Sequence, residues 1–225
     1  MLKKIFIFCH GWSFDKSFWD PLNKYFYNQE CIYLDLGYFN QNNLQDLIKT
    51  MPKYYTKNYY VVAVTHSFGL IRLLSLGFKF NLIIAIQSFI NFLGTTHQLR
   101  LNRTKELSLM IENFTKNPNQ TLLKFYRACN KRFIINQNIN YNLLLSDLKA
   151  LYLNYDNTLP NNIPILIINA SNDPIVPTEL IEDNFKNNKQ AIIKTINSKT
   201  HNLCNNHSNF LFELTKDFIN YNYAN

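Results

Sequence analysis

The stretch Tyr59-Tyr60-Val61-Val62-Ala63-Val64, followed by Thr65-His66-Ser67-Phe68-Gly69, indicates the fold of this chain. The apolar run is typical of a buried parallel strand, and a helical pattern begins directly after Gly69. A strand that turns sharply into a helix at a serine holds the hydroxyl above the edge of the sheet and leaves the next N–H available to an oxyanion. We therefore expect Ser67 to be a nucleophile and the Phe68 N–H to be an oxyanion donor.

One position departs from the usual G-x-S-x-G pattern of such a turn, because Thr65 stands where the first glycine is expected. Such a turn needs a small residue two positions before and two positions after the serine, and only the second of these positions, Gly69, is a glycine here. The competing interpretation is a strand that ends in an ordinary serine N-cap. A second alternative is a degenerate enzyme that only binds partners.

Two further strand patterns supply an acid and a base in the chain order serine, acid, histidine. The apolar run 163–169 precedes a turn-rich loop that carries Asp173, and the run 191–196 precedes His201. Nucleophilic serine chemistry needs an imidazole to take and return the proton and a carboxylate to orient that imidazole. We expect His201 and Asp173 to have these roles. The alternatives are a turn-forming aspartate before Pro174 and a surface loop histidine.

The start of the chain offers a second oxyanion donor. Residues 2–9 form a strand pattern that runs into His10-Gly11-Trp12. Loops of this type present a backbone N–H to an oxyanion, and glycine permits the close approach. We expect the Trp12 N–H to be this donor, its indole to line the acyl pocket or to pack, and His10 to bond the loop. A secretory signal is the alternative for residues 1–9, but no small-residue cleavage site follows them.

Together these motifs resemble the α/β-hydrolases. Within them the likeness is nearest to the pimeloyl-acyl-carrier-protein methyl ester esterases of biotin synthesis, through the H-G-W loop, the serine turn and the ending His201, His207, Phe210. The resemblance covers most of the chain except its middle. It implies a serine carboxylesterase that frees the pimeloyl carboxylate, with an acyl carrier protein presenting the substrate. A hydrolase of free small esters or of carbon–carbon bonds is the alternative on the same fold.

Composition limits the remaining possibilities. With 225 residues, 47% of them hydrophobic, the chain can form one large core, so we expect a single α/β domain over residues 1–225 with a mostly parallel sheet flanked by helices. The net charge of +8 favours an acidic partner, but no nucleic-acid-binding motif accompanies it. The apolar runs are far shorter than the roughly 20 residues that span a bilayer, so no membrane partner is expected.

Cysteine and histidine usage argues against bound cofactors. The 4 cysteines show no C-x-x-C spacing, and no cluster has the spacing of metal ligands. We expect no metal and no cofactor. Reduced thiols fit a cytoplasmic location.

The alternation of strand and helix breaks between about residues 89 and 159, where apolar residues recur at helical spacing. We expect a helical lid insertion there that covers the active site and selects the acyl group. Lys124, Arg127 and Lys131 follow the spacing i, i+3, i+7 and are expected on one helix face, extended by Arg132. This basic face would dock the carrier protein. A solvated lysine-rich face is the competing interpretation.

Periodicity predicts the other elements. Helices are expected at 16–27, 44–55, 70–80 and 208–221, and strands at 31–35 and 82–87. The last helix is expected to place Phe210, Leu211, Leu214 and Phe218 in the core.

Overall fold

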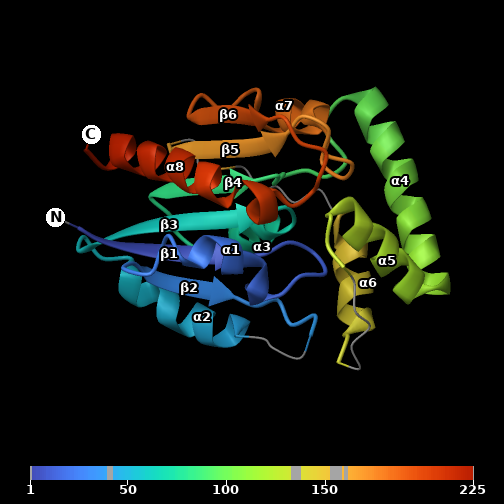
Figure 1. Cartoon of the computed structure of the whole chain (residues 1–225), viewed down its shortest axis with the longest axis horizontal. Coiled ribbons are helices and arrows are strands. Elements are labelled where there is room, and N and C mark those ends of the chain that lie inside the picture. The colour runs from blue at the N-terminus through green and yellow to red at the C-terminus, as the bar shows by residue number, and fades with distance from the viewer. Residues whose placement is uncertain (1, 40–42, 133–137, 153–158, 160–161, 225) are drawn as a thin grey trace.

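The computed structural model contains one six-stranded sheet and describes residues 2–39, 43–132, 138–152, 159 and 162–224 (Figure 1). The strands are β1 (Lys3–Cys9), β2 (Glu30–Leu34), β3 (Tyr59–His66), β4 (Leu82–Ile86), β5 (Ile165–Ala170) and β6 (Ala191–Ile196). They are ordered β2-β1-β3-β4-β5-β6, and every pairing is parallel. The predicted α/β fold with a parallel sheet is confirmed.

Helices connect these strands and cover the sheet. They are η1 (Lys16–Trp19), α1 (Asp20–Asn23), α2 (Leu44–Thr50), η2 (Met51–Tyr54), α3 (Gly69–Ser75), α4 (His97–Lys116), α5 (Pro118–Ala128), α6 (Tyr141–Ala150), α7 (Thr178–Phe185) and α8 (Leu203–Ala224). In Figure 1, α1 and α8 lie in front of the sheet and pack against each other. The central strands β3, β4 and β5 are mostly apolar and are buried along almost their whole length, as is typical of strands covered by helices on both faces.

The predicted helices at 44–55 and 70–80 are shorter in the structure, for reasons visible in the sequence. The first is divided into α2 and the 3-10 helix η2, in which Pro52 cannot donate a backbone hydrogen bond. The second ends at Ser75, because Gly77 adopts a left-handed φ of 67° that terminates the helix. The helix expected at 16–27 forms only η1 and α1 and ends at Asn23.

The last helix begins earlier than predicted and buries a different stripe. α8 starts at Leu203 and bends at His207, where φ is −127°. Phe210 was expected in the core but is 51% exposed, whereas its neighbour Leu211 is buried together with Phe218. Successive helical residues lie about 100° apart, so Phe210 falls outside the buried stripe. The prediction for Phe210 is therefore wrong.

The helices α4, α5 and α6 follow β4 and precede β5. Figure 1 shows them beyond the end of the sheet toward which the strand arrows point. This is the edge at which loops after parallel strands gather, and ligands of open α/β sheets bind there. Residues 133–137 and 153–158 of the expected insertion lie outside the described residues. Among the described helices, none is long and apolar enough to cross a bilayer.

Candidate active site

Ser67 lies at the sharp turn between β3 and α3. Its φ of 53° is in the left-handed region, which a non-glycine residue adopts only when the surrounding structure enforces it. The Ser67 N–H donates to the Ile86 carbonyl at 3.1 Å, which fixes the turn to the neighbouring strand β4. A Cβ atom on Gly69 would lie 2.4 Å from the Cys9 carbonyl oxygen and 2.6 Å from that of His10, so only glycine fits there. The backbone therefore has the geometry expected of a nucleophile turn.

Thr65 is accommodated without disturbing this turn. Its side chain is fully buried in β3, opposite the small residue Ala85 of β4. The Thr65 hydroxyl donates to the Ile84 carbonyl at 3.3 Å and lies 3.3 Å from the Ser88 hydroxyl. Because the hydroxyl is hydrogen-bonded and the opposite side chain is small, threonine takes the place of the usual glycine without a buried unpaired group.

The structure brings Ser67, His201 and Asp173 together from loops after three different strands. The Ser67 Oγ atom lies 2.9 Å from His201 Nε2, and His201 Nδ1 lies 2.8 Å from Asp173 Oδ2. In this arrangement Nδ1 donates to the carboxylate, which leaves Nε2 to accept the serine proton. All three side chains are buried. They form a continuous hydrogen-bonded path, in which the serine proton can pass to His201 while Asp173 orients the imidazole.

The Asp173 carboxylate is held from several sides. Its Oδ1 accepts the backbone N–H groups of Ile175 at 2.8 Å and Val176 at 3.0 Å. Its Oδ2 accepts the Gln87 side-chain amide at 2.5 Å in addition to His201 Nδ1. A carboxylate with this many donors has a fixed orientation, and its position fixes that of the imidazole.

Gln87 is a residue of this site that sequence reasoning missed. It follows β4, is fully buried and has a left-handed φ of 48°. Its Nε2 donates to Asp173 Oδ2 and, at 2.7 Å, to the Thr200 carbonyl, while its Oε1 accepts the Leu203 N–H at 3.0 Å. Gln87 thus joins the loop of the acid to the loop of the base. A glutamine after a strand carries no local signal of such a role.

With Ser67 as the expected nucleophile, replacing Gln87 by glutamate is predicted to lower kcat/KM for an activated model ester by about 10- to 100-fold. The substitution keeps the shape but turns the donor toward Asp173 and Thr200 into an acceptor, and leaving buried groups unpaired costs about 1–3 kcal/mol. The measurement is steady-state turnover of p-nitrophenyl acetate. Gln190→Glu is the matched control, because Gln190 is exposed and the chemical change is the same. Equal activities of the two variants would contradict the role given to Gln87.

The expected oxyanion donors lie close to Ser67. A Cβ atom on Gly11 would be 3.0 Å from Ser67 Cβ and 2.7 Å from His66 Nδ1, so the loop that carries Trp12 touches the serine turn. Within the described residues, neither the Trp12 N–H nor the Phe68 N–H has a hydrogen-bond acceptor. Two available N–H groups beside a nucleophile are the components of an oxyanion hole.

Two buried histidines support the site without belonging to the proton path. His10 donates through Nδ1 to the Gly11 carbonyl at 2.9 Å and accepts the Leu36 N–H at 3.1 Å through Nε2, so it bonds its own loop. His66 Nε2 donates to the His201 backbone carbonyl at 3.1 Å. Burial, followed by repulsion from His201, holds the pKa of His66 well below its ordinary value. The hydrogen bond of His66 therefore positions His201, and its lowered pKa makes His66 a weak base.

The helices α4, α5 and α6 are fastened over this site. The Trp12 indole donates to the Leu144 carbonyl of α6 at 2.9 Å and packs against Phe114 of α4 and Phe125 of α5. The His201 N–H donates to the Ala128 carbonyl at the end of α5, at 3.1 Å. Under this cover Ser67 is only 5% exposed. The Ser67 hydroxyl therefore lies beneath α4, α5 and α6 and their side chains.

The expected basic face does not form on a single helix. α5 ends at Ala128, where Asn130 has a left-handed φ of 48° and the Lys131 N–H donates back to the Tyr126 carbonyl. Lys131 therefore leaves the helix, and its ammonium lies 5.3 Å from the centre of the Phe14 ring. The prediction that Lys131 continues the helix face is wrong.

The other basic residues remain on the surface. Lys124, Arg127 and Arg132 are exposed. Lys124 lies on a cleft between α4 and α5, whereas Arg127 lines a polar cleft of about 310 Å³ with Lys199 near the His201 loop. The positive charges thus border two clefts on either side of α5.

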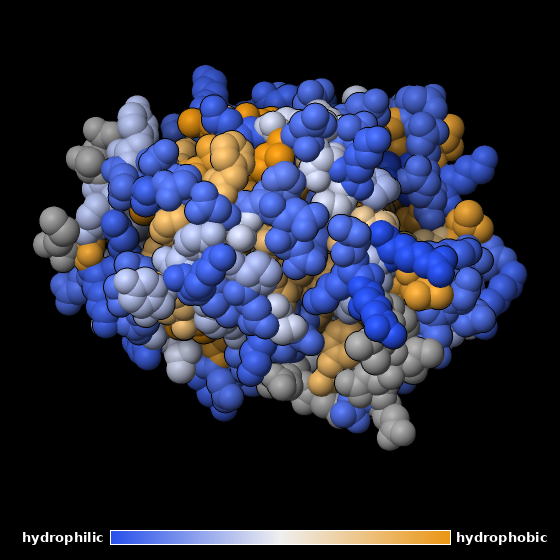
Figure 2. Space-filling view, in the orientation of Figure 1, coloured by the Kyte–Doolittle hydropathy of each residue, from blue (hydrophilic) through white to orange (hydrophobic). Residues whose placement is uncertain are grey.

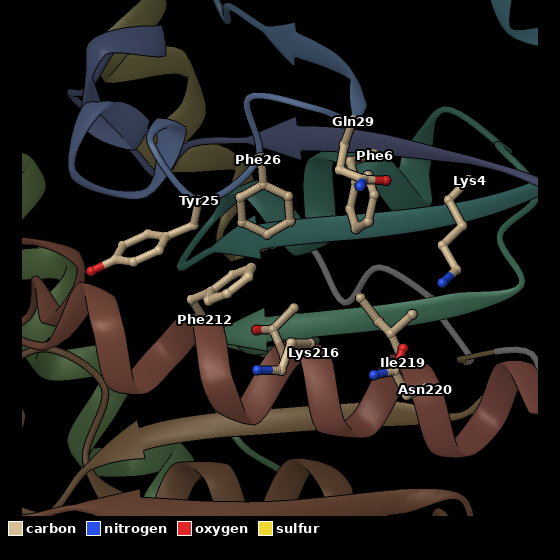
Figure 3. Close-up of a pocket in the computed structure, with 10 residues that line it drawn as sticks. Lys4, Phe6, Tyr25, Phe26, Gln29, Phe212, Lys216, Ile219 and Asn220 are labelled. Atoms are coloured by element: carbon tan, nitrogen blue, oxygen red, sulfur yellow. The ribbon is translucent and has the colours of Figure 1, made fainter.

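A separate cavity of about 280 Å³ lies between α8, the segment after α1 and strand β1 (Figure 3). Aromatic side chains of Phe6, Phe26 and Phe212 line it, with Lys4 and Lys216 among its polar residues. Phe6 and Lys4 belong to the first half of β1, away from the strand ends that precede Ser67, Asp173 and His201. The cavity has no part in the proton path. Within the described ranges, no cluster of His, Cys, Asp or Glu is arranged to hold a metal ion.

Comparison with known proteins identifies the fold. No protein-family model and no curated protein matches the sequence. Solved structures are similar over nearly the whole chain. A lipase-esterase related protein from Clostridium acetobutylicum has a TM-score of 0.71 and 17% identity, with 96% of this chain and 94% of that chain covered. MenH from S. aureus has a TM-score of 0.70 and 13% identity, with 99% and 96% covered.

A bromoperoxidase from Bacillus anthracis has a TM-score of 0.74 and 14% identity, with 98% of this chain and 92% of that chain covered. These similarities establish that the protein has the α/β-hydrolase fold, so the resemblance noted in the sequence is confirmed at the level of the fold. At such low identities they carry no information about the substrate.

Proposed function

We propose that this protein is a serine carboxylesterase. The observation that supports this most directly is the hydrogen-bonded path from Ser67 through His201 to Asp173, built on a strained serine turn. A serine N-cap, the competing interpretation, needs neither the imidazole 2.9 Å away nor the left-handed φ. An inactive binding protein would not require a serine, a histidine and an aspartate to be hydrogen-bonded in this order.

The reaction follows from the positions of these groups. Ser67 Oγ attacks the ester carbonyl carbon while His201 Nε2 takes its proton, and Asp173 stabilises the imidazolium. The Trp12 and Phe68 N–H groups receive the negative oxygen of the tetrahedral intermediate. His201 then gives the proton to the departing alkoxide, which leaves as the alcohol. Water, deprotonated by His201, then attacks the acyl-enzyme. The second tetrahedral intermediate collapses to release the acid, and His201 returns the proton to Ser67 Oγ.

For the substrate we propose the methyl ester of pimeloyl-acyl-carrier protein, by resemblance to the esterases of biotin synthesis. The H-G-W loop, here at the serine turn, and the basic residues exposed around α5 support this assignment. A cytoplasmic location, where such carriers occur, agrees with cysteines that are all free.

Two experiments test the proposed function. Purified protein should release methanol from methyl pimeloyl-acyl-carrier protein, and its expression should restore growth of a biotin auxotroph that lacks the methyl esterase. Turnover of free p-nitrophenyl esters without either result would favour the general esterase. Failure of a fluorophosphonate probe to label Ser67 would favour the inactive binding protein.

Reversing two exposed charges on α5 is expected to separate carrier recognition from catalysis. The double variant Lys124→Glu, Arg127→Glu should lower kcat/KM for the carrier-bound ester by about 10- to 100-fold, because charge complementarity governs association with an acidic partner. Turnover of p-nitrophenyl acetate should stay within about twofold.

The matched control is Lys49→Glu, Lys57→Glu, which changes the net charge equally at exposed residues on and after α2. The comparison is made at low and at physiological salt, where screening should reduce the difference. An equal loss in both double variants would assign the effect to net charge. No loss in either would contradict carrier docking at α5.

A further inference from the structure

A cleft of about 380 Å³ between α4 and α5 has the size of a small-molecule site. Apolar side chains supply most of the surface that lines this cleft. They include Leu109 and Met110 of α4, Phe125 and Ala128 of α5, and Ile175 of the loop that carries the acid. Figure 2 shows apolar side chains exposed among hydrophilic ones over the region of α4 and α5.

Three residues that line this cleft, namely Phe125, Ala128 and Ile175, also contact His201 or Asp173. The Phe125 ring lies 6.3 Å from the His201 ring, centre to centre, and the Ala128 carbonyl accepts the His201 N–H. The Ile175 N–H donates to Asp173 Oδ1 at 2.8 Å. One wall therefore separates the cleft from the catalytic groups. A chain attached to an ester at Ser67 needs to pass only this wall to enter the cleft.

Phe125 is the part of the wall that faces both sides. Its ring lies edge-on against Trp12 at 4.9 Å and against His201, so it stands between the oxyanion loop and the base. Phe125 thus lies between the cleft on one side and Trp12 and His201 on the other. The neighbouring cleft on the other side of α5 is lined by polar residues such as Arg127, Asn130 and Lys199, which an alkyl chain avoids.

We propose that the cleft between α4 and α5 binds the alkyl chain of a medium-length acyl group, and that Phe125 is the gate between this chain and the triad. The inference rests on the proposed function, because it requires an acyl group at Ser67. It predicts that the enzyme prefers octanoyl to acetyl esters. The preference should depend on the surface of the cleft.

Two exposed leucines of α4 give a matched test. Leu109 lines the cleft and is 58% exposed. Leu101 lies about two helical turns earlier on α4, does not line the cleft, and is 56% exposed. Leu109→Glu should lower kcat/KM for p-nitrophenyl octanoate by at least about 10-fold. The loss of even one methylene contact in a hydrophobic pocket lowers kcat/KM by about this factor, and a carboxylate removes more than one. Its turnover of p-nitrophenyl acetate should stay within about twofold. Leu101→Glu should change neither value. Met110→Trp, which fills the cleft, should act as Leu109→Glu does.

Other outcomes are separable. Equal ratios of octanoate to acetate turnover in Leu109→Glu and Leu101→Glu would overturn the proposal, as would a wild-type enzyme without preference for the longer chain. Calorimetric titration of octanoate into the Ser67→Ala protein tests the cleft without turnover. Equal octanoate affinities after adding Leu109→Glu or Leu101→Glu to this protein would also overturn the proposal. Absence of all ester turnover, with octanoate still bound in the cleft, would instead remove the proposed function and leave the binding site.

Discussion

Ser67→Ala is expected to lower kcat for p-nitrophenyl acetate by about 10⁶-fold. Serine hydrolases that lose the nucleophile retain only the contribution of binding and of the oxyanion hole, and the loss in kcat is of this order. Among the residues that the structure describes, the Ser67 hydroxyl is the one nucleophilic group hydrogen-bonded to His201 Nε2. The measurement is steady-state turnover, with mass spectrometry of fluorophosphonate-treated protein to locate the labelled residue.

Ser171→Ala provides the control for this experiment. Ser171 is exposed in the turn after β5, and its hydroxyl makes only long or surface hydrogen bonds. That variant should be labelled and should turn over substrate as the wild type does. Activity of Ser67→Ala within tenfold of the wild type would show that another group attacks the ester, and the proposed mechanism would have to be abandoned.

Gly69→Ala is expected to have the largest effect on stability, about 3 kcal/mol or more. The added methyl group would lie 2.4 Å from the Cys9 carbonyl oxygen and 2.6 Å from that of His10, and neither backbone atom can move without displacing the end of β1. For a chain of this length such a loss lowers Tm by about 6–12 °C. Because the loop after β1 carries Trp12, loss of an oxyanion donor should also reduce kcat by about 10²-fold or more.

Gly77→Ala is the matched methyl addition. A Cβ atom there meets nothing within 4 Å, although φ is 67°, so only the backbone conformation opposes the substitution. The expected cost is about 1–2 kcal/mol, with no change in kcat. Thermal unfolding and ester turnover of Gly69→Ala and Gly77→Ala are the two measurements that compare the variants. Similar Tm values and similar kcat values for the two would show that the approach of Gly69 to β1 is not tight in solution.

The sequence predicted the serine turn and the acid and base candidates because each one directly follows a strand pattern. Loops after parallel strands converge at one edge of a sheet, so the order and position of Ser67, Asp173 and His201 along the chain were enough to expect them side by side. The strand and turn patterns are local, and local patterns are what a single sequence displays.

The features that were missed depend on contacts between distant segments. Gln87 acquires its role only when the loops of Asp173 and Thr200 close around it. The end of α5 was missed because Asn130, rather than a glycine, takes the left-handed position that terminates the helix. Phe210 was misplaced because the true start and bend of α8 shift the buried stripe.

The pairing of β4 with β5 has a consequence for how this scaffold can change. Ile83 to Ile86 pair directly with Ile165 to Ile168, so the sheet is continuous across the point where α4, α5 and α6 depart and return. The strand pairing beneath Asp173 therefore does not depend on the length of that segment, whereas the His201 N–H and the Trp12 indole do depend on its Ala128 and Leu144 carbonyl groups. A segment grafted between β4 and β5 would thus leave the sheet intact, but it would have to supply acceptors for the Trp12 indole and the His201 N–H to preserve the site.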